Sequence, residues 1–413
     1  MQIGVVGVGG GGTALVDALS ADDAGRAANY LVDALALDTD ASALANLDRV
    51  DEDDRYLLGA IHTDGEGTAG DTDLAAEIAL EERPELQAAV DSLPVGRTDA
   101  TVVCAALGGG TGAGIAPAVV DLLGQVTSTP VYALGVLPGV AEVGGDGEAA
   151  DATTDGPRRS SAAGSDAGSG TGGGVAAGDD GDGDRSGRPD RPLASNAAGA
   201  VRALSAAGDA LLLADLDVWR ASGGTYADAW PRLEAAVAGR LGSILTAGEA
   251  ADPTPERVLD ASELTNTLDA GGVTALGTAA TAVENGRREG LVGGLIDRIG
   301  GADGPTVDEG EAVSVATNAA RKAISHRLSL PCDRTSASRA AIVFHAPPAW
   351  LSRRGLERAR GLIEEETGVP EIRWGDHPDP TAEEFRVTVL LSGITTSDRL
   401  AALDGAVDPT QLG

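Results

Sequence analysis

The chain of 413 residues has very little lysine, few aromatic side chains and few cysteines. Lys322 is its only lysine. The chain has 64 acidic and 30 basic residues, which gives a formal net charge of −34. Without a basic patch the chain cannot neutralise the phosphate backbone of a nucleic acid, so nucleic acid is not an expected partner. A charge this large repels itself unless salt screens it, and the screening length falls to about 3 Å at 1 M. Because the acids are spread along the whole chain rather than gathered in a tail, the composition predicts a protein of a salt-filled cytoplasm.

The small numbers of cysteine and histidine exclude further classes of site. Cys104 and Cys332 are isolated in the sequence and the four histidines are scattered, so neither a disulfide nor a metal site is expected. No apolar stretch approaches the roughly 20 residues that a membrane helix needs, and no signal peptide is visible. The sequence therefore predicts a soluble, cytoplasmic protein with no metal site and no transmembrane segment.

Two glycine-rich segments stand between a strand pattern and a helix pattern. Residues 108–114 read GGGTGAG, between the apolar run 100–107 and a helix-like run that follows, and residues 7–12 (GVGGGG) are placed in the same way near the N-terminus. Glycines allow several N–H groups to approach one anion, and the N-terminus of the next helix adds partial positive charge. No lysine follows either segment as in a Walker A motif, so backbone dipoles must hold the phosphates. Two such cradles in one domain predict a nucleotide site.

Two alternatives remain at this point. Either segment can be a glycine loop without a ligand. In addition, Gly7, Gly9 and Gly12 satisfy the GxGxxG pattern of NAD-binding proteins, and Asp38 is a candidate for the acidic residue that ends the second strand there. A Rossmann-type NAD-dependent dehydrogenase is therefore the alternative reading of the N-terminal segment.

The order of the glycine segments resembles that of the tubulin/FtsZ superfamily of self-assembling GTPases. Further segments resemble the superfamily's second, third, fifth and sixth nucleotide loops: residues 37–44, 65–72, 131–139 and 215–219. Within the superfamily the sequence is similar to the archaeal CetZ group, on the motifs at residues 130–132 (PVY), 137–139 (LPG), 215–219 (DLDVW) and 262–268 (SELTNTL).

The resemblance implies that GTP or GDP binds to the loops, with Mg²⁺ as a candidate companion ion. The residues expected to contact the nucleotide are Gly9, Gly10, Gly11, Gly12, Thr39, Gly67, Gly70, Asp71, Thr72, Gly108, Gly109, Gly110, Thr111, Gly112, Trp230 and Glu234. Several loop positions depart from the superfamily pattern: Gly10, Ala14, Asp38, Ala69, Thr72 and Leu216. Each lost purine hydrogen bond costs about 0.5 to 1.5 kcal/mol, and an added aspartate repels phosphates, so weaker affinity and slow turnover are expected.

Trp230 and Glu234 are the candidates for recognising the base. They are four residues apart, hence neighbours on one side of a helix. An indole can stack on a purine, and a carboxylate can accept hydrogen bonds from guanine N1–H and its amino group, a donor pair that adenine lacks. The superfamily places an aromatic and a base-reading side chain at matching positions, so guanine is favoured. The alternative makes Trp230 a core residue and Glu234 a solvated one.

Asp260 and Glu263 are the candidate catalytic residues. In the superfamily the nucleotide lies on one subunit, and a loop of the next subunit completes the active site around it. The acids of that loop match these two positions. A carboxylate can orient the attacking water and accept its proton. Asp260 and Glu263 lie three residues apart, so both project from one face of a helix's first turn. In the alternative, Asp260 is only the N-cap of an ordinary helix and Glu263 its third residue.

The sequence predicts an α/β fold in which a parallel-sheet, Rossmann-like GTPase domain is joined by a long central helix to a smaller α+β domain. The expected boundaries are residues 1–225 for the GTPase domain, 226–248 for the helix, 249–396 for the second domain and 397–413 for a tail. Residues 140–191 are rich in Gly, Asp and Ser, and are expected to form a disordered acidic insertion.

The leading functional hypothesis is a cytoskeletal GTPase that assembles head to tail into filaments and serves cell shape or division in a halophilic archaeon. The expected partners are further copies of the chain and other tubulin/FtsZ-like proteins. The alternatives are a nucleotide-binding relative that has lost polymerisation or hydrolysis and regulates other filaments, and the dehydrogenase named above.

Overall fold

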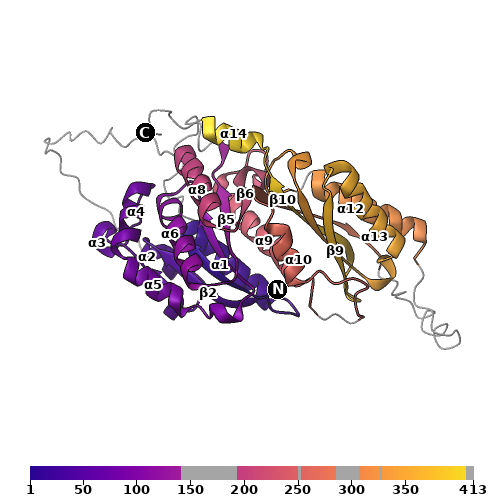
Figure 1. Ribbon diagram of the computed structural model, residues 1–413, viewed down its shortest axis with the longest axis horizontal. Coiled ribbons are helices and arrows are strands. Elements are labelled where there is room, and N and C mark those ends of the chain that lie inside the picture. The colour runs from indigo at the N-terminus through magenta and orange to yellow at the C-terminus, as the bar shows by residue number, and fades with distance from the viewer. Residues whose placement is uncertain (141–192, 250–252, 285–306, 326–327, 406–413) are drawn as a thin grey trace, which may run out of the picture.

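The fold is built on one ten-stranded sheet with the strand order β3-β2-β1-β4-β5-β6-β7-β10-β8-β9. The computed structural model describes residues 1–140, 193–249, 253–284, 307–325 and 328–405. In Figure 1 the N-terminal half lies to the left and the C-terminal half, with β9 and β10, to the right. The insertion expected at residues 140–191 falls, except for Val140, outside the described residues.

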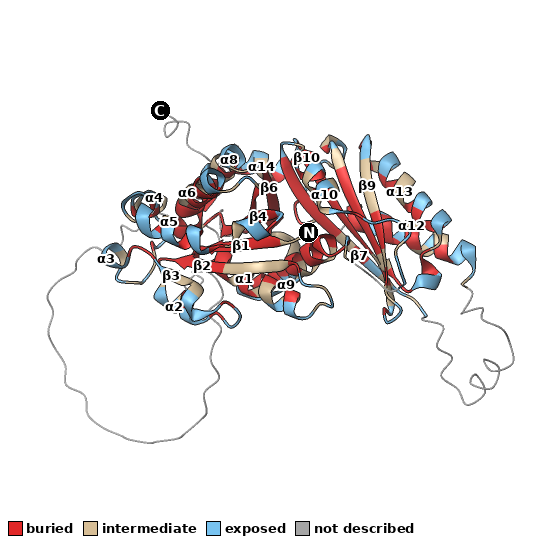
Figure 2. Ribbon diagram, turned by 60° about the horizontal axis from the view of Figure 1, so that its bottom comes forward, coloured by how far each residue is buried: buried red, intermediate tan, exposed pale blue. Residues whose placement is uncertain are grey.

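The N-terminal half consists of parallel strands that are buried on both faces. Its strands are β1 (Ile3–Val8), β2 (Leu31–Asp38), β3 (Arg55–Leu57), β4 (Ala100–Ala106), β5 (Val131–Leu137) and β6 (Ala210–Asp215). Every residue of β1, β4, β5 and β6 is buried, which explains their continuous apolar runs. Figure 2 shows these strands in red beneath helices whose outer sides are blue.

Helices cover this part of the sheet on both faces. They are α1 (Gly9–Ala24), α2 (Ala41–Ala45), α3 (Ala60–Thr63), α4 (Thr72–Glu81), α5 (Arg83–Ser92), α6 (Gly110–Val126) and α8 (Leu193–Ala207). The apolar sides of α4, α5, α6 and α8 belong to one hydrophobic core, and those of α1 and α9 to a second core on the other face. No helix in the described part of the chain is long and apolar enough to cross a membrane.

Helix α9 (Tyr226–Leu245) is the expected central helix and connects the two halves. It begins in a capping box in which Thr225 and Asp228 satisfy each other's backbone N–H groups. It packs along α1 in the N-terminal half. Near its other end the buried Arg240 donates through Nη1 to the carbonyl of Leu276, at 2.9 Å, and so reaches the first strand of the C-terminal half.

The C-terminal half is a mixed α+β unit. Its described elements are α10 (Ala261–Leu268), β7 (Val273–Ala282), α12 (Glu309–Ser325), β8 (Arg339–Ala346), α13 (Arg353–Thr367), β9 (Glu371–Pro378), β10 (Glu384–Ile394) and α14 (Asp398–Gly405). Strand β10 pairs antiparallel with both β7 and β8. The chain's two phenylalanines, Phe344 and Phe385, lie 6.3 Å apart between ring centroids, and Phe344 also meets Trp374 edge to face at 6.0 Å. The expected architecture of a parallel-sheet domain, a long helix and a smaller α+β domain is confirmed.

The C-terminal segment departs from expectation, because a helix follows residue 397 where the sequence predicts a tail. Helix α14 packs on α8, and its Leu403 is buried in the core. Arg399, also buried, lies 3.0 Å through Nε from a carboxylate oxygen of Asp215 at the end of β6, and its guanidinium donates to the carbonyl of Pro138. This ion pair joins residues 184 positions apart, so no local pattern reveals it.

Removing the cation of this buried pair should destabilise the protein strongly. Arg399→Leu leaves the Asp215 carboxylate buried without its ionic partner, which costs about 3–5 kcal/mol in the free energy of unfolding. Burial already raises the pKa of Asp215 despite the attraction of Arg399, and losing Arg399 raises this pKa further. A carboxyl with a raised pKa in the folded state favours folding at low pH, so the deficit should shrink between about pH 7 and about pH 5.

Urea unfolding midpoints at molar KCl, measured at both pH values, test this expectation. The control is Arg353→Leu, which removes the exposed pair with Glu357 on α13 and should leave the midpoint nearly unchanged. A deficit for Arg399→Leu that stays constant with pH would contradict the assignment to Asp215.

Candidate nucleotide site

The two glycine turns lie side by side at the carboxyl edge of the parallel strands. Strands β1 and β4 are neighbours in register, and each leads directly into a helix, β1 into α1 and β4 into α6. Gly9, with φ of +71°, approaches the second turn so closely that a Cβ on it would lie 2.8 Å from the amide nitrogen of Gly112. A Cβ on Gly12 would lie 2.2 Å from the carbonyl oxygen of Cys104. The glycines therefore permit both the tight packing and the approach of backbone N–H groups to a common point.

The helices that begin at these turns present their first N–H groups without side-chain caps. Within the described residues, neither α1 nor α6 has a side-chain cap or an acidic residue in its first turn. Uncapped N-terminal N–H groups and the helix dipole favour an anion at this position. Helix α4 differs, because the carboxylate of Asp71 caps it by accepting from the N–H groups of Asp73 and Leu74, each at 3.0 Å.

Two further loops join the glycine turns through three buried threonines. The hydroxyl of Thr111, in the first turn of α6, lies 2.7 Å from that of Thr39 and 3.2 Å from that of Thr68. Gly110 lies against the same loop, since a Cβ there would be 2.7 Å from the backbone nitrogen of Asp71. Gly67 and Gly70 have φ of +79° and +90°, a conformation that favours glycine. The structure thus brings together the loops in which the sequence predicts contacts to phosphate.

The residues expected to read the base are both buried. Trp230 and Glu234 lie one turn apart on α9 and are 6% and 4% exposed. The indole of Trp230 packs against Gly11, where a Cβ would lie 2.8 Å from it. It also lines a cavity of only about 20 Å³, together with Ala106, Gly108, Gly109, Val136, Leu137, Pro138, Leu193 and Leu216. In this conformation Trp230 packs as a core residue. The burial of Trp230 agrees with the alternative interpretation, whereas the burial of Glu234 does not, because that interpretation makes Glu234 a solvated side chain.

Asp260 and Glu263 lie at the first turn of α10. Asp260 is exposed and is the N-cap of this helix, accepting from the N–H of Glu263 at 2.8 Å, a bond that lowers the pKa of Asp260. The carboxylate of Glu263 lies 3.8 Å from the guanidinium of Arg257. Asp260 therefore caps α10, as the alternative interpretation expects. The cap uses the backbone N–H of Glu263 and not its carboxylate.

These acids lie at the opposite edge of the sheet from the glycine turns. The amino group of Met1 donates to the carbonyl of Leu245 at 2.7 Å and lies 3.5 Å from Glu249, in the segment that leads toward α10. Figure 1 shows the N-terminus beside α10. Strand β1 then runs for six residues, about 20 Å, before it reaches its glycine turn. The acids of one copy therefore lie away from the glycine turns of the same copy.

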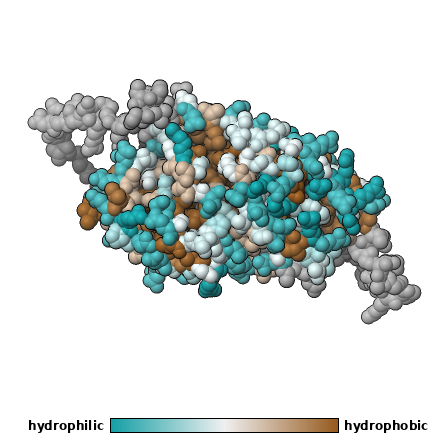
Figure 3. Space-filling view, viewed as in Figure 1, coloured by the Kyte–Doolittle hydropathy of each residue, from teal (hydrophilic) through white to brown (hydrophobic). Residues whose placement is uncertain are grey.

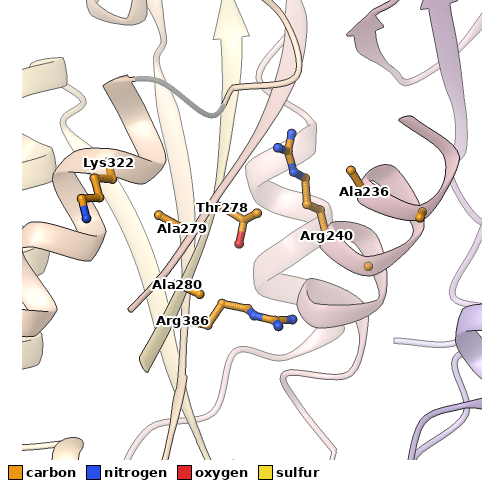
Figure 4. A pocket seen from close by; sticks show the side chains of 9 residues that line it. Ala236, Arg240, Thr278, Ala279, Ala280, Lys322 and Arg386 are labelled. Carbon is orange, nitrogen blue, oxygen red and sulfur yellow. The ribbon is translucent and has the colours of Figure 1, made fainter. Parts of the chain in front are cut away.

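A larger cavity, of about 670 Å³, lies between α9 and the strands β7 and β10 (Figure 4). Three cations line it: Arg240, Lys322 and Arg386. Two of them already have partners, since Arg240 bonds Leu276 and Arg386 pairs with Glu384. None of the residues predicted to bind nucleotide lines this cavity, so it is separate from the glycine turns.

Both halves of the chain match known protein families. Residues 2–153 match the GTPase domain of the Tubulin/FtsZ family, and residues 223–407 match the C-terminal domain of tubulin-like CetZ. The tubulin-like protein CetZ1 of Haloferax volcanii is 34% identical over 407 residues, which cover 98% of this chain and 91% of that protein. The chain belongs to the CetZ group of the tubulin/FtsZ family. The predicted resemblance is confirmed, and the dehydrogenase alternative is excluded.

Further relatives support the assignment of this chain to the CetZ group. CetZ5 of the same organism is 33% identical over 98% of this chain and 90% of its own length. Among solved structures, the GDP-bound monomer of H. volcanii CetZ1 matches with a TM-score of 0.75 and 30% identity, over the full length of both chains. The GTPγS-bound protofilament of H. volcanii CetZ2 also matches with a TM-score of 0.75, at 27% identity and over the full length of both.

The departures from the superfamily pattern have visible structural effects in this CetZ chain. The buried carboxylate of Asp38 is turned toward the backbone, where it accepts from the N–H of Thr39 at 2.7 Å and of Asp40 at 3.2 Å. Leu216 is buried in the small cavity beside Trp230. Ala69 adopts φ of +52°, in the left-handed region that glycine would occupy without strain. The third loop therefore holds a strained residue.

Replacing Ala69 by glycine should relieve this strain. A left-handed L-residue costs about 1 kcal/mol or more, so Ala69→Gly should raise the midpoint of urea unfolding or leave it unchanged despite the greater entropy of the unfolded chain. The matched control is Ala76→Gly on the exposed side of α4, which should lower stability by about 1 kcal/mol. Equal losses in both variants would show that position 69 carries no strain.

Proposed function

We propose that this CetZ chain binds GTP at its paired glycine turns and hydrolyses it within head-to-tail filaments, serving cell shape or division in a halophilic archaeon. The observation that carries the proposal is the contact of two uncapped helix N-termini, α1 and α6, at one edge of the sheet. The GDP-bound and GTPγS-bound relatives support a guanine nucleotide as the ligand. The net charge of −34 and the single lysine fit a cell interior rich in salt.

In the proposed complex, backbone groups supply most of the phosphate contacts. The N–H groups of Gly9 to Gly12 and of Gly109 to Gly112 stand at the starts of α1 and α6, where the helix dipoles favour the charge of the phosphates. The buried hydroxyls of Thr39, Thr68 and Thr111 hold the neighbouring loops against these turns. Mg²⁺ would be held chiefly by the phosphates and water, since it keeps most of its hydration shell and needs few protein ligands.

The active site of the proposed filament is completed between copies. Because Asp260 and Glu263 lie at the amino edge of the sheet and the glycine turns at the carboxyl edge, stacking copies head to tail brings one copy's acids to the next copy's nucleotide. Such an interface is heterologous and does not close, so it generates a filament. The two acids would orient the attacking water and accept its proton.

Exposed apolar side chains at the carboxyl and amino edges of the parallel strands support such stacking. At the carboxyl edge, Ile61 of α3, which follows β3, is 91% exposed. Figure 3 shows apolar atoms protruding at the left end of the molecule, where α3 lies in Figure 1. At the amino edge, Val258 is exposed two residues before Asp260. Exposed apolar residues at both edges suit a contact between copies.

A second candidate function is favoured by the small cavity beside Trp230. Among the described residues, the indole and Leu216 line a cavity of only about 20 Å³, which is too small for a purine. This fits a nucleotide-binding CetZ relative with slow or lost turnover that regulates filaments of other tubulin-like proteins. Pelleting at molar KCl with GTP or with GDP separates the two, because pelleting that ignores the nucleotide favours the regulator.

Removing the carboxylate of Glu263 should stop turnover without affecting nucleotide binding. We expect Glu263→Ala to lower GTP turnover by about a hundredfold, the usual contribution of a general base, and to leave the Kd for GTP unchanged. Phosphate release and fluorescent-nucleotide binding at molar KCl measure the two quantities. The control is Glu256→Ala, which removes an exposed carboxylate of the same segment. Unchanged hydrolysis in Glu263→Ala removes this residue from the mechanism.

The role of Glu234 in reading the base has its own test. Glu234→Gln keeps the shape of this buried side chain but replaces one acceptor by a donor, so the preference for GTP over ATP should fall about tenfold. Competition binding with the two nucleotides gives the ratio of their Kd values. Arg232→Gln, an exposed change on the same helix, should leave the ratio as it is. If Glu234→Gln leaves the ratio of the two Kd values unchanged, Glu234 is a core residue with no role in reading the base.

A further inference from the structure

The segment that leads into α10 is held by three consecutive residues of β9, Trp374, Gly375 and Asp376, here called the β9 clasp. The carboxylate of Asp376 accepts from two successive N–H groups of the segment, that of Glu256 at 3.0 Å and that of Arg257 at 2.7 Å. In return the N–H of Asp376 donates to the carbonyl of Arg257 at 3.0 Å. Asp376 is only 3% exposed, so these bonds are shielded from water.

The other two residues of the β9 clasp fix the same segment from the side. A Cβ on Gly375 would lie 2.8 Å from the amide nitrogen of Leu259 and 3.1 Å from the carbonyl oxygen of Arg257, so only glycine allows this approach. The guanidinium of Arg257 lies over the ring of Trp374, 5.1 Å from its centroid. The same guanidinium is 3.8 Å from the carboxylate of Glu263. The clasp therefore acts on the residues that immediately precede Asp260 and on one that contacts Glu263.

These contacts bear on the chemistry because the acids must be placed accurately. A carboxylate that accepts two backbone N–H groups binds more strongly than a neutral acceptor would. A misplacement of about 1 Å in a reacting group costs on the order of a hundredfold in rate. Of the three residues of the β9 clasp, Asp376 is the one whose carboxylate accepts from the backbone N–H groups of both Glu256 and Arg257.

We propose that Asp376 is a positioning residue for hydrolysis between copies: it holds residues 256–259 so that Asp260 and Glu263 reach the nucleotide of the adjoining copy. This rests on the proposed function. Asp376 touches neither nucleotide nor water in this scheme, and it acts only through the segment that it binds. Its loss should therefore damage the acid-bearing end of a copy and spare the nucleotide-binding end.

Mixing two defective variants tests this division of roles. Asp376→Asn turns one of the two accepting oxygens into an amide donor facing the N–H of Glu256 or Arg257. Its partner in the mixture is Gly109→Asp, which places a carboxylate where the phosphates would bind. Gly109 is the N-cap of α6 with φ of −78° and ψ of 172°, a conformation and position that aspartate adopts readily, so α6 should remain intact.

We expect Asp376→Asn alone to lose GTP turnover by about a hundredfold with an unchanged Kd for GTP, and Gly109→Asp alone to bind no GTP. In an equimolar mixture, the intact pocket of the first variant meets the intact acids of the second, so turnover should return. A copy that had simply misfolded could not restore it. Asp379→Asn, which removes a carboxylate bonded to Thr381 and His345 but not to the segment, is the matched control and should keep full turnover.

The outcomes separate the two levels of the proposal. Two results would overturn the role of Asp376. The first is full turnover by Asp376→Asn alone. The second is that the mixture of Asp376→Asn with Gly109→Asp stays inactive while the mixture of Glu263→Ala with Gly109→Asp recovers turnover. Failure of the Glu263→Ala mixture, when Glu263→Ala alone is inactive, overturns the shared active site itself. Recovery in both mixtures supports the positioning role.

Discussion

The close contact between two strand-to-helix turns is the constraint on which the rest of the structure depends. Gly9 meets Gly112 backbone to backbone, and Gly12 lies on the carbonyl of Cys104, with no room for a Cβ at Gly9 or Gly12. The same absence of side chains that allows this packing exposes the first N–H groups of α1 and α6. Packing and anion binding therefore make the same demand on the sequence, and a substitution at either glycine would affect both.

In the proposed function, the direction of the parallel strands explains why one copy would hold only part of the chemistry. Loops that follow the strands of the N-terminal half gather at their carboxyl edge, whereas the chain enters β7 from α10 at the amino edge. The buried amino group of Met1, bonded to Leu245, marks that second edge. A site that needs groups from both edges must draw on two molecules, so filament assembly and nucleotide turnover are coupled by topology in the proposed function.

Much of the fold follows from the sequence, because buried parallel strands such as β1 and β4 read as continuous apolar runs and α9 keeps helical spacing throughout. Contacts between distant residues do not follow in this way. Arg399 meets Asp215 across 184 positions, and Asp376 meets Arg257 across 119. The glycine loops could be found from their spacing, but the burial of Trp230 against Gly11 depends on how α9 packs on α1. Local pattern thus indicates the loops of the candidate site, and long-range packing determines how their side chains are buried.

The seam between the two halves has a mechanical meaning. Strands β6 and β7 are in register over only two residue pairs, Leu211 with Val273 and Leu212 with Thr274, whereas β7 and β10 pair along most of their length. Other bonds take the place of a long ladder at this seam. Ser329 connects the two strands, because its Oγ donates to the carbonyl of Leu213 and its N–H donates to the carbonyl of Leu276. Arg240 adds a buried bond from α9 to Leu276. The two halves are therefore coupled by single side chains, so one substitution at Ser329 or Arg240 would loosen the connection between them.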